Sequence, residues 1–140
     1  MNTKVYTDGL PLDAEKIRKE VFVEEQGFQN EFDETDTTAT HIVLYNEDDV
    51  PIATCRVFRD DKREAYTIGR LAVVKKYREK NLGTDVVESA EKYIRKQGGH
   101  SAILHAQCRV SNFYQKLGYA PYGDVEDDEG CPHIWMRKQL

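Results

Sequence analysis

The chain has 140 residues, of which 39% are hydrophobic and 32% are charged. This length suits a single hydrophobic core and leaves no room for a second. The formal net charge of −5 argues against nucleic acid as a partner, because that function normally needs a basic surface. No apolar run approaches the roughly 18 residues that a membrane-spanning helix needs, and the first residues lack a secretory signal. We therefore expect one cytoplasmic domain, residues 1–140, without a membrane partner.

The first half of the chain predicts an edge strand, a helix and a meander of three strands. Residues 3–6 are β-rich, and a helix begins at Pro11 because the fixed φ of proline suits a first helical turn. The acidic segment 28–40 predicts a loop or a short irregular helix. Three β-rich runs separated by polar turns then occupy residues 41–45, 52–58 and 65–74, a pattern typical of antiparallel strands.

The second half predicts a long helix followed by a shorter set of alternating elements. The period becomes helical from Asp85, and the Gly98-Gly99 pair ends this helix. A strand, a helix and two strands follow at residues 101–106, 110–117, 119–123 and 134–137. The order β-α-(α)-β-β-β-α-β-α-β-β indicates an α/β (α+β) fold with a mixed, mostly antiparallel central sheet flanked by helices.

A basic loop joins the third strand of the meander to the long helix. It contains Lys75, Lys76, Arg78 and Lys80 on an otherwise acidic chain, which favours a small anionic ligand over a long polyanion. A helix N-terminus offers unpaired backbone N–H groups and a positive dipole end, so a pyrophosphate could bind here. Gly83 lets the backbone approach such a ligand, and Asn81 tolerates the left-handed φ of a tight loop. An ordinary strand-to-helix turn is the alternative.

Two motifs in this half of the chain resemble one known family. Arg78-x-x-Asn81-x-Gly83 resembles the Gln/Arg-x-x-Gly-x-Gly/Ala signature of the GNAT N-acetyltransferases. Residues 112–119, NFYQKLGY, are similar to the family's N-x-x-FY-x-K-x-GF type of helix and turn. The pair is more specific than either motif alone. Within the family the chain resembles small bacterial proteins of the YjcF/ElaA type, whose opening R-x-x-VF-V-E-Q is similar to residues 18–26.

The resemblance implies a fold, a cosubstrate and a set of contacts. The fold has a V-shaped splay between two parallel strands, and acetyl-CoA is the acetyl donor, with no metal. The pyrophosphate would lie on the backbone of residues 78–84, and the pantetheine arm would pair with the strand before it. The implied donor-binding residues are Leu71, Ala72, Val73, Arg78, Glu79, Lys80, Asn81, Leu82, Gly83, Thr84, Asn112 and Tyr114.

The same resemblance implies two catalytic groups and leaves a third open. A strand bulge would aim the Leu71 amide at the thioester carbonyl as oxyanion donor, and Tyr114 would be the general acid for the leaving thiolate. Ile68 stands where several relatives carry a glutamate base. The base must therefore come from elsewhere, act through water, or be unnecessary for an amine that arrives neutral. The candidates left open are Glu24, Glu25, Asp36, His41 and His133.

Two further departures and one ion-pair prediction concern charge. Glu79 and Asn81 stand where the family often has glycine, and Glu79 would weaken pyrophosphate binding unless its side chain turns outward. Arg56 and Arg70 lie in strands of apolar character. Because a buried charge needs a partner, we expect one of them to pair with a carboxylate of the segment 33–36 and to fix that segment over the acceptor cleft.

Three functions from different classes remain at this stage. The first is transfer of an acetyl group from acetyl-CoA to a primary amine of a small molecule or peptide, by direct attack in a ternary complex. The second is a non-catalytic acyl-CoA-binding or partner-binding module. Ile68 supports this alternative because it stands at the position of the glutamate base. The third is a hydrolase that uses Cys131 with His133; otherwise the three cysteines match neither a disulfide framework nor a zinc site. Exposed edge strands could also pair two subunits into a homodimer.

Overall fold

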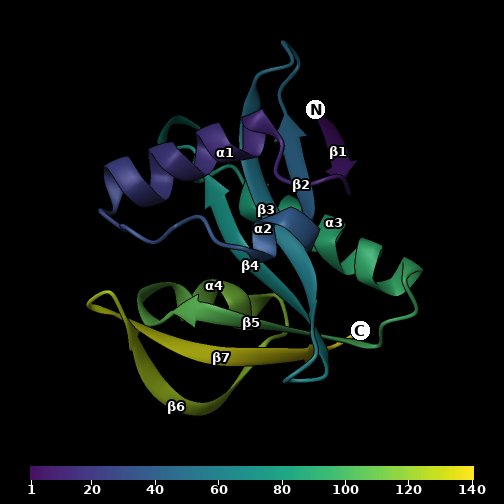
Figure 1. Cartoon of the computed structure of the whole chain (residues 1–140), viewed down its shortest axis with the longest axis vertical. Coiled ribbons are helices and arrows are strands. Elements are labelled where there is room, and N and C mark those ends of the chain that lie inside the picture. Colours follow the sequence, from purple (N-terminus) through teal and green to yellow (C-terminus); the bar gives the residue numbers. More distant parts are fainter.

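The computed structural model describes residues 1–140, and its elements follow the predicted order (Figure 1). The strands are β1 (Asn2–Tyr6), β2 (Thr40–Tyr45), β3 (Pro51–Asp60), β4 (Ala65–Val73), β5 (Ser101–Gln107), β6 (Ala120–Asp128) and β7 (Cys131–Gln139). The α-helices are α1 (Leu12–Arg18), α2 (Thr35–Thr38), α3 (Leu82–Lys96) and α4 (Ser111–Lys116). A π-helix, η1 (Lys19–Glu25), continues α1, and two 3-10 turns, η2 (Lys75–Tyr77) and η3 (Cys108–Val110), precede α3 and α4.

The seven strands form one sheet in the order β1-β2-β3-β4-β5-β7-β6. All neighbours are antiparallel except β4 and β5, which are parallel and pair only at Tyr66–Ala102 and Thr67–Ile103. Beyond these two pairs the strands diverge, and Figure 1 shows the gap between the β4 and β5 arrows widening toward their ends. The expected V-shaped splay between two parallel strands is therefore confirmed. It opens the sheet in its middle rather than at an edge.

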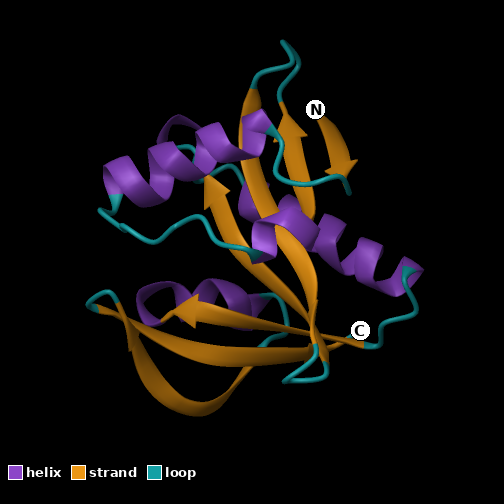
Figure 2. Ribbon diagram, viewed as in Figure 1, coloured by secondary structure: helices purple, strands orange, loops and turns teal.

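Helices cover both faces of the sheet, and each face has its own core (Figure 2). The larger cluster of 17 buried residues packs α3 against the sheet, with Val86, Val87 and Ile94 fully or almost fully buried. The smaller cluster of seven packs α1 and η1 against the opposite face. Because side chains alternate along a strand, the same strands supply both cores.

The N-terminal helix begins as predicted and then changes its winding. Pro11 is the residue that caps α1, with an extended backbone, and the helix continues from Leu12. From Lys19 the backbone adopts the rarer π form, which is frequent at functional sites. The apolar spacing of the sequence does not distinguish the two helix types, so this change was not predicted.

Strand β4 carries a bulge next to the splay. Its register with β3 shifts by one residue between Gly69, which pairs with Arg56, and Ala72, which pairs with Thr54. Arg70 lies inside this irregularity with a φ of 53°, a left-handed conformation that non-glycine residues rarely adopt. One extra residue bends the strand and redirects the backbone beside it.

Several predicted boundaries are corrected. Helix α3 begins at Leu82 instead of residue 85, so residues 82–84 form its first turn and are not part of the loop. Strands β6 and β7 extend well beyond 119–123 and 134–137, because they pair as a long hairpin whose polar residues gave no apolar signal. The acidic segment 28–40 contains the short helix α2, in agreement with the loop or short irregular helix expected there. None of the helices combines the length and apolar character required to cross a membrane.

Candidate active site

A cavity of about 690 Å³ occupies the splay between β4 and β5. Its walls come from both strands, the end of η1, the loop before α3, the first turn of α3, and α4. Most of the residues expected to bind the acyl donor line it: Leu71, Ala72, Val73, Arg78, Glu79, Asn81, Leu82, Gly83, Thr84 and Tyr114. Lys80 and Asn112 do not line it; both are exposed, and Lys80 lies over the Tyr77 ring.

The start of α3 presents free backbone donors to this cavity. The first backbone bond of the helix runs from the Asp85 N–H to the Asn81 carbonyl, so the N–H groups of residues 82–84 have no intrahelical acceptor. Asn81 has a φ of 60° and Glu79 a φ of 66°. Both residues occupy the left-handed region where the family often has glycine, so the backbone keeps the loop shape despite the side chains. Three donors and the positive end of a 15-residue helix therefore converge at one place.

Arg78 joins this loop to the end of η1. Its Nη atoms donate to both carboxylate oxygens of Glu25 at 2.6 and 2.7 Å, and its Nε donates to the Val73 carbonyl at 2.9 Å. The hydrogen bonds from Arg78 hold the pKa of the Glu25 carboxyl below its usual value. A lower pKa makes Glu25 a poorer proton acceptor, although it lines the cavity.

The other side of the cavity is crossed by two polar bridges. The Gln107 amide donates to the Gln26 side-chain oxygen at 2.9 Å. The Glu129 carboxylate, at the tip of the β6–β7 hairpin, accepts from the backbone N–H groups of Gln29 and Asn30 at 3.0 and 3.2 Å. These contacts join the segment after η1 to the C-terminal strands across the splay, so the cavity is partly covered on the α1 face.

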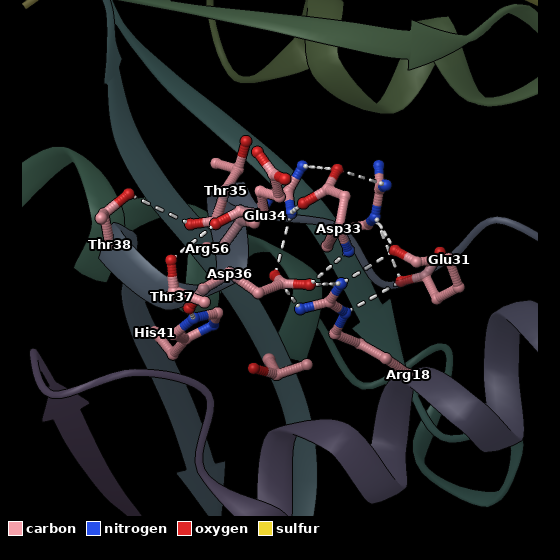
Figure 3. A network of polar contacts seen from close by, with 12 residues as sticks. Arg18, Glu31, Asp33, Glu34, Thr35, Asp36, Thr37, Thr38, His41 and Arg56 are labelled. Atoms are coloured by element: carbon pink, nitrogen blue, oxygen red, sulfur yellow. Dashed lines mark hydrogen bonds and ion pairs between the residues drawn. The ribbon is translucent and has the colours of Figure 1, made fainter.

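A network of buried charges holds the segment before α2 against the sheet (Figure 3). Arg18 is 1% exposed and donates to Asp36 at 2.7 Å and to Glu31 at 2.8 Å. Arg56 donates to Asp33 at 2.6 Å and to Asp36 at 2.9 Å. In Figure 3 the Asp36 carboxylate lies between the two guanidinium groups. The ion pairs predicted for Arg56 are confirmed, and Arg18 is a partner that the sequence did not indicate.

Arg70 connects this network to the bulge. Its Nε lies 3.1 Å from the Glu31 carbonyl and 3.2 Å from the Glu31 carboxylate, and an Nη lies 3.4 Å from Asp33. The predicted pairing of Arg70 with this segment is thus also confirmed. Leu71, the expected oxyanion donor, follows Arg70 directly and lines the cavity. Arg70, the left-handed residue next to Leu71, is therefore anchored by the contacts of its side chain with Glu31 and Asp33.

The structure separates the five base candidates. Asp36 and His41 lie outside the cavity and are buried in the charge network. Burial alone would raise the pKa of Asp36, but hydrogen bonds from Arg18, the Asp33 backbone and Arg56 hold the pKa well below its usual range. His41 Nε2 bonds to the Asp36 carbonyl at 2.9 Å, and burial lowers the pKa of His41. Glu24 is exposed and does not line the cavity.

Only Glu25 and His133 among these candidates line the cavity. The structure also brings residues there that the sequence reasoning missed, notably Glu31, His105 and Gln107. The alternation along residues 101–107 could have placed His105 and Gln107 on one face. Nothing local to residue 31 could have shown that Glu31 is 4% exposed, because its burial depends on Arg18 and Arg70.

Tyr114 reaches the cavity from α4. Its ring packs edge-on against Phe113 and Tyr119, with centroids 5.0 and 6.1 Å away. Burial, with a smaller contribution from Cys55, raises the pKa of the Tyr114 hydroxyl. The phenol therefore stays protonated throughout the working pH range and remains available as a donor.

The pairing expected for a cysteine hydrolase is absent. Cys131 and His133 both lie in β7, but the His133 ring bonds to the Cys131 carbonyl at 2.8 Å and not to its thiol. Burial raises the pKa of the Cys131 thiol, which is the opposite of what an activated nucleophile requires. We therefore abandon this hypothesis. No group of three or more His, Cys, Asp or Glu side chains is arranged to hold a metal ion.

Comparison with known proteins gives the relationship directly. The sequence profile described as "Acetyltransferase (GNAT) domain" matches residues 8–140. The chain belongs to the GNAT acetyltransferase family. The chain is 38% identical to BSU40680, a candidate acetyltransferase of Bacillus subtilis, over 99% of this chain and 97% of that one. It is 30% identical to Escherichia coli ElaA over 89% of this chain and 84% of that one.

Solved structures agree with this assignment. The crystal structure of a candidate N-acetyltransferase from Lactobacillus plantarum has a TM-score of 0.88 at 30% identity, covering 100% of this chain and 99% of that one. Escherichia coli ElaA gives 0.85 at 26% identity, with 99% of each chain covered. The GNAT fold and the resemblance to ElaA-type members are thereby confirmed. This GNAT chain is an acyltransferase by family, and the splay that defines the fold is the place where its cavity lies.

Proposed function

We propose that this GNAT protein transfers an acetyl group from acetyl-CoA to a primary amine, by direct attack in a ternary complex. The observation that carries the proposal is the combination of the free N–H groups of residues 82–84 with a cavity that runs into the splay. These donors suit a pyrophosphate, and the cavity between β4 and β5 suits an extended pantetheine arm. GNAT enzymes act on amines, and the acceptor here is a small molecule or peptide.

Each end of the cavity supplies a different part of the proposed reaction. The first turn of α3 and the loop before it bind the phosphates. In this proposal the Leu71 amide, which follows the bulge, stabilises the negative oxygen of the thioester during attack. Tyr114, protonated and reaching in from α4, donates to the departing sulfur. In this proposal Lys80 and Asn112 contribute at most at the exposed rim.

The most informative variant for the phosphate site is Glu79→Gly. Glu79 has a left-handed φ and lines the cavity, so glycine keeps the backbone conformation while removing a negative charge. Repulsion of this charge by a pyrophosphate at roughly 7 Å is on the order of 1 kcal/mol, so CoA should bind about fivefold more tightly. Isothermal titration calorimetry measures this directly.

A matched control exists at Glu64. It also has a positive φ, of 52°, and is exposed in the β3–β4 turn, away from the cavity. Glu64→Gly changes the same charge and relieves the same strain, so it should leave CoA affinity unchanged. Equal effects of the two variants would place the pyrophosphate elsewhere.

A substitution at Gly83 tests the phosphate site less directly, although Gly83 belongs to the motif. A Cβ at this position would lie 3.1 Å from the Phe113 ring, so Gly83→Val would press on α4 as well as on a bound phosphate. A loss of CoA binding in that variant would have two explanations.

A binding module without turnover is the second candidate, favoured by the apolar Ile68 at the family's glutamate position. Ile68 is 2% exposed. Thiol release from acetyl-CoA in the presence of spermidine, kanamycin and a lysine peptide separates the two functions. Release that depends on an amine supports the enzyme, and tight CoA binding without release supports the module.

A further inference from the structure

Two histidines lie next to each other on the face of the sheet that carries α1. Along β5, Leu104 and Ala106 belong to the core on the α3 side. Because side chains alternate along a strand, His105 and Gln107 face the opposite side. His133 in β7 is the cross-strand partner of Gln107, and the His105 and His133 rings have centroids 5.0 Å apart. Both histidines line the cavity.

The hydrogen bond of His133 fixes which of its nitrogens carries the proton. A carbonyl can only accept, so the 2.8 Å bond to the Cys131 carbonyl requires the proton on Nδ1. Nε2 then carries the lone pair of a neutral imidazole. It has no partner within the protein and is not among the occluded polar atoms, although the residue as a whole is 93% buried (7% exposed). An oriented, accessible lone pair on an imidazole is what a general base needs.

Three of the five carboxylates that line the cavity are already engaged. Glu25 is held by Arg78, and Glu31 lies between Arg18 and Arg70. Glu129 accepts two backbone N–H groups. Asp128 on the hairpin and Glu79 in the loop before α3 remain, but both are exposed. A water-exposed carboxylate is a much weaker base than an imidazole. His133 differs from these carboxylates because its Nε2 has no hydrogen-bond partner and its ring is held in one orientation by the bond from Nδ1.

The faces of the sheet divide the two proton transfers between His133 and Tyr114. Tyr114 packs with the core on the α3 side, whereas His133 is paired with Gln107, which faces α1 and bonds to Gln26. A thioester lying in the splay would then have an acid on one side of the sheet and a base on the other. This arrangement suits a direct transfer, because the attacking amine and the departing sulfur are separate substituents of the tetrahedral intermediate and each needs its own proton-transfer group.

We propose that His133 is the general base of the reaction and acts through Nε2, an inference that rests on the proposed function. Nε2 takes one proton from the acceptor's ammonium group, which frees the nitrogen lone pair. The C–N bond then forms and the C–S bond breaks. The sulfur leaves with the Tyr114 proton, and the nitrogen's second proton returns to Tyr114 through solvent. His133 finally releases its proton to water, so the net products are amide, free thiol and one proton.

Several charged groups surround the two imidazoles and contribute to the pH dependence. Glu126 of β6 is the cross-strand partner of His133, and its carboxylate lies 3.4 Å from His105 Nε2. The charge of Asp128 in β6 raises the pKa of His105, and the charge of Arg63 in the β3–β4 turn lowers it. Burial, followed by the neighbouring His133, lowers the pKa of His105. His105 is therefore neutral near pH 7 and places no positive charge beside His133.

The test compares His133→Asn with wild type in thiol release from acetyl-CoA, using spermidine, kanamycin and a lysine peptide as acceptors. Asparagine can still donate to the Cys131 carbonyl but has no atom in place of Nε2. We expect kcat/KM at pH 7 to fall by about 10²-fold or more, and the decline of kcat/KM toward low pH to disappear. CoA affinity by calorimetry should not change. His100→Asn, at an exposed histidine before β5, is the control and should behave as wild type.

Three results would overturn the proposal. A His133→Asn enzyme within threefold of wild type shows that the base is elsewhere. Nitrogen NMR of the wild-type protein that finds the His133 proton on Nε2 removes the lone pair, and this measurement does not depend on the acceptor. Wild-type protein that releases no thiol with any of the three amines overturns the proposed function, and the base assignment with it. Restoration of His133→Gly activity by free imidazole would support the assignment.

Discussion

At the scale of single residues, the site depends on which polar atoms are free and which are engaged. Glu25, Asp36 and His41 looked equivalent to His133 in the sequence. The carboxylate oxygens of Glu25 and Asp36 are engaged by arginines, whereas His41 donates from Nε2 to the Asp36 carbonyl and its Nδ1 is occluded inside the protein. A residue's chemistry is therefore decided by its partners. Tyr114 shows the opposite situation: no hydrogen bond engages its hydroxyl, and burial raises the pKa of this group so that it stays protonated.

Tyr114→Phe tests the role of that hydroxyl. The ring would still pack against Phe113 and Tyr119, so KM for acetyl-CoA should change little while kcat falls by about 10²–10⁴-fold. Because the raised pKa keeps the phenol protonated, the loss should be the same from pH 6 to pH 9. Steady-state kinetics over this range measure it. A loss below roughly tenfold, about 1.4 kcal/mol in barrier, would leave the tyrosine as packing and shift the proton to water.

At the scale of elements, the bulge in β4 is held in place by a segment remote in sequence. Residues 31–36 contribute three carboxylates that bind three arginines, from α1, β3 and β4. Buried ion pairs contribute little net stability, but removing one partner leaves an uncompensated charge and costs about 3–5 kcal/mol. The network therefore positions the bulge and the segment before α2 relative to each other more than it stabilises the fold.

Arg70→Gly separates this positioning role from backbone strain. Glycine accepts the left-handed φ of 53° but loses the contacts to Glu31 and Asp33, so the bulge remains and its anchor is lost. Glu31 keeps Arg18 and Asp33 keeps Arg56 as partners, so no carboxylate is left unpaired and we expect thermal stability to change little. We expect kcat to fall by about tenfold, with a smaller change in KM for acetyl-CoA. Arg70→Ala should show the same kinetic loss and be less stable than the glycine variant by about 1 kcal/mol, because alanine keeps the left-handed strain that the arginine also carries. Wild-type kcat in the glycine variant would contradict the anchoring role.

At the scale of the whole molecule, buried titratable groups link the fold to pH. Burial lowers the pKa of His41 and of His105, so the unfolded chain binds more protons than the folded one below about pH 6.5. Hydrogen bonds from Arg18 and Arg56 outweigh burial and lower the pKa of Asp36, so its stabilising contribution is lost below about pH 4. Burial raises the pKa of Glu31. Protonation of Glu31 as the pH falls therefore favours the folded state and partly offsets the destabilisation caused by the histidines.

We therefore expect the free energy of unfolding to fall as the pH drops from 6.5 to 5, and to fall again below 4. Each histidine contributes up to about 1.4 kcal/mol per pH unit. His41→Gln keeps a donor for the Asp36 carbonyl and does not titrate, so it should remove about half of the upper slope. Urea denaturation at several pH values checks this, and an unchanged slope in the variant would show that His41 does not contribute.

Both ends of the sheet are exposed, and the predictions that concern them remain open to experiment. All nine residues of β6 are exposed, as are four of the five in β1. The homodimer, the cytoplasmic location and the absence of a nucleic-acid partner stay predictions. Light scattering would measure the oligomeric state.

The order of the elements and the family could be predicted from the sequence, whereas phosphate binding by the loop before α3 stays a prediction. Local rules suffice for these: alternation for β2 to β4, helical spacing for α3, and an asparagine at the left-handed position just before α3. The motifs singled out Tyr114 and Leu71, and both line the cavity; their catalytic roles stay predictions. The Arg56 pairing followed from the cost of burying a charge.

Which side chains meet in the splay depends on the tertiary fold and could not be predicted from the sequence. His133 and His105 are 28 residues apart in sequence and become neighbours through the pairing of β5 with β7. Arg18 and Glu31 meet because α1 packs over the face of the sheet that the following segment crosses. Such contacts depend on strand register and helix placement, which are set by the burial of the whole core and leave no local pattern in the chain.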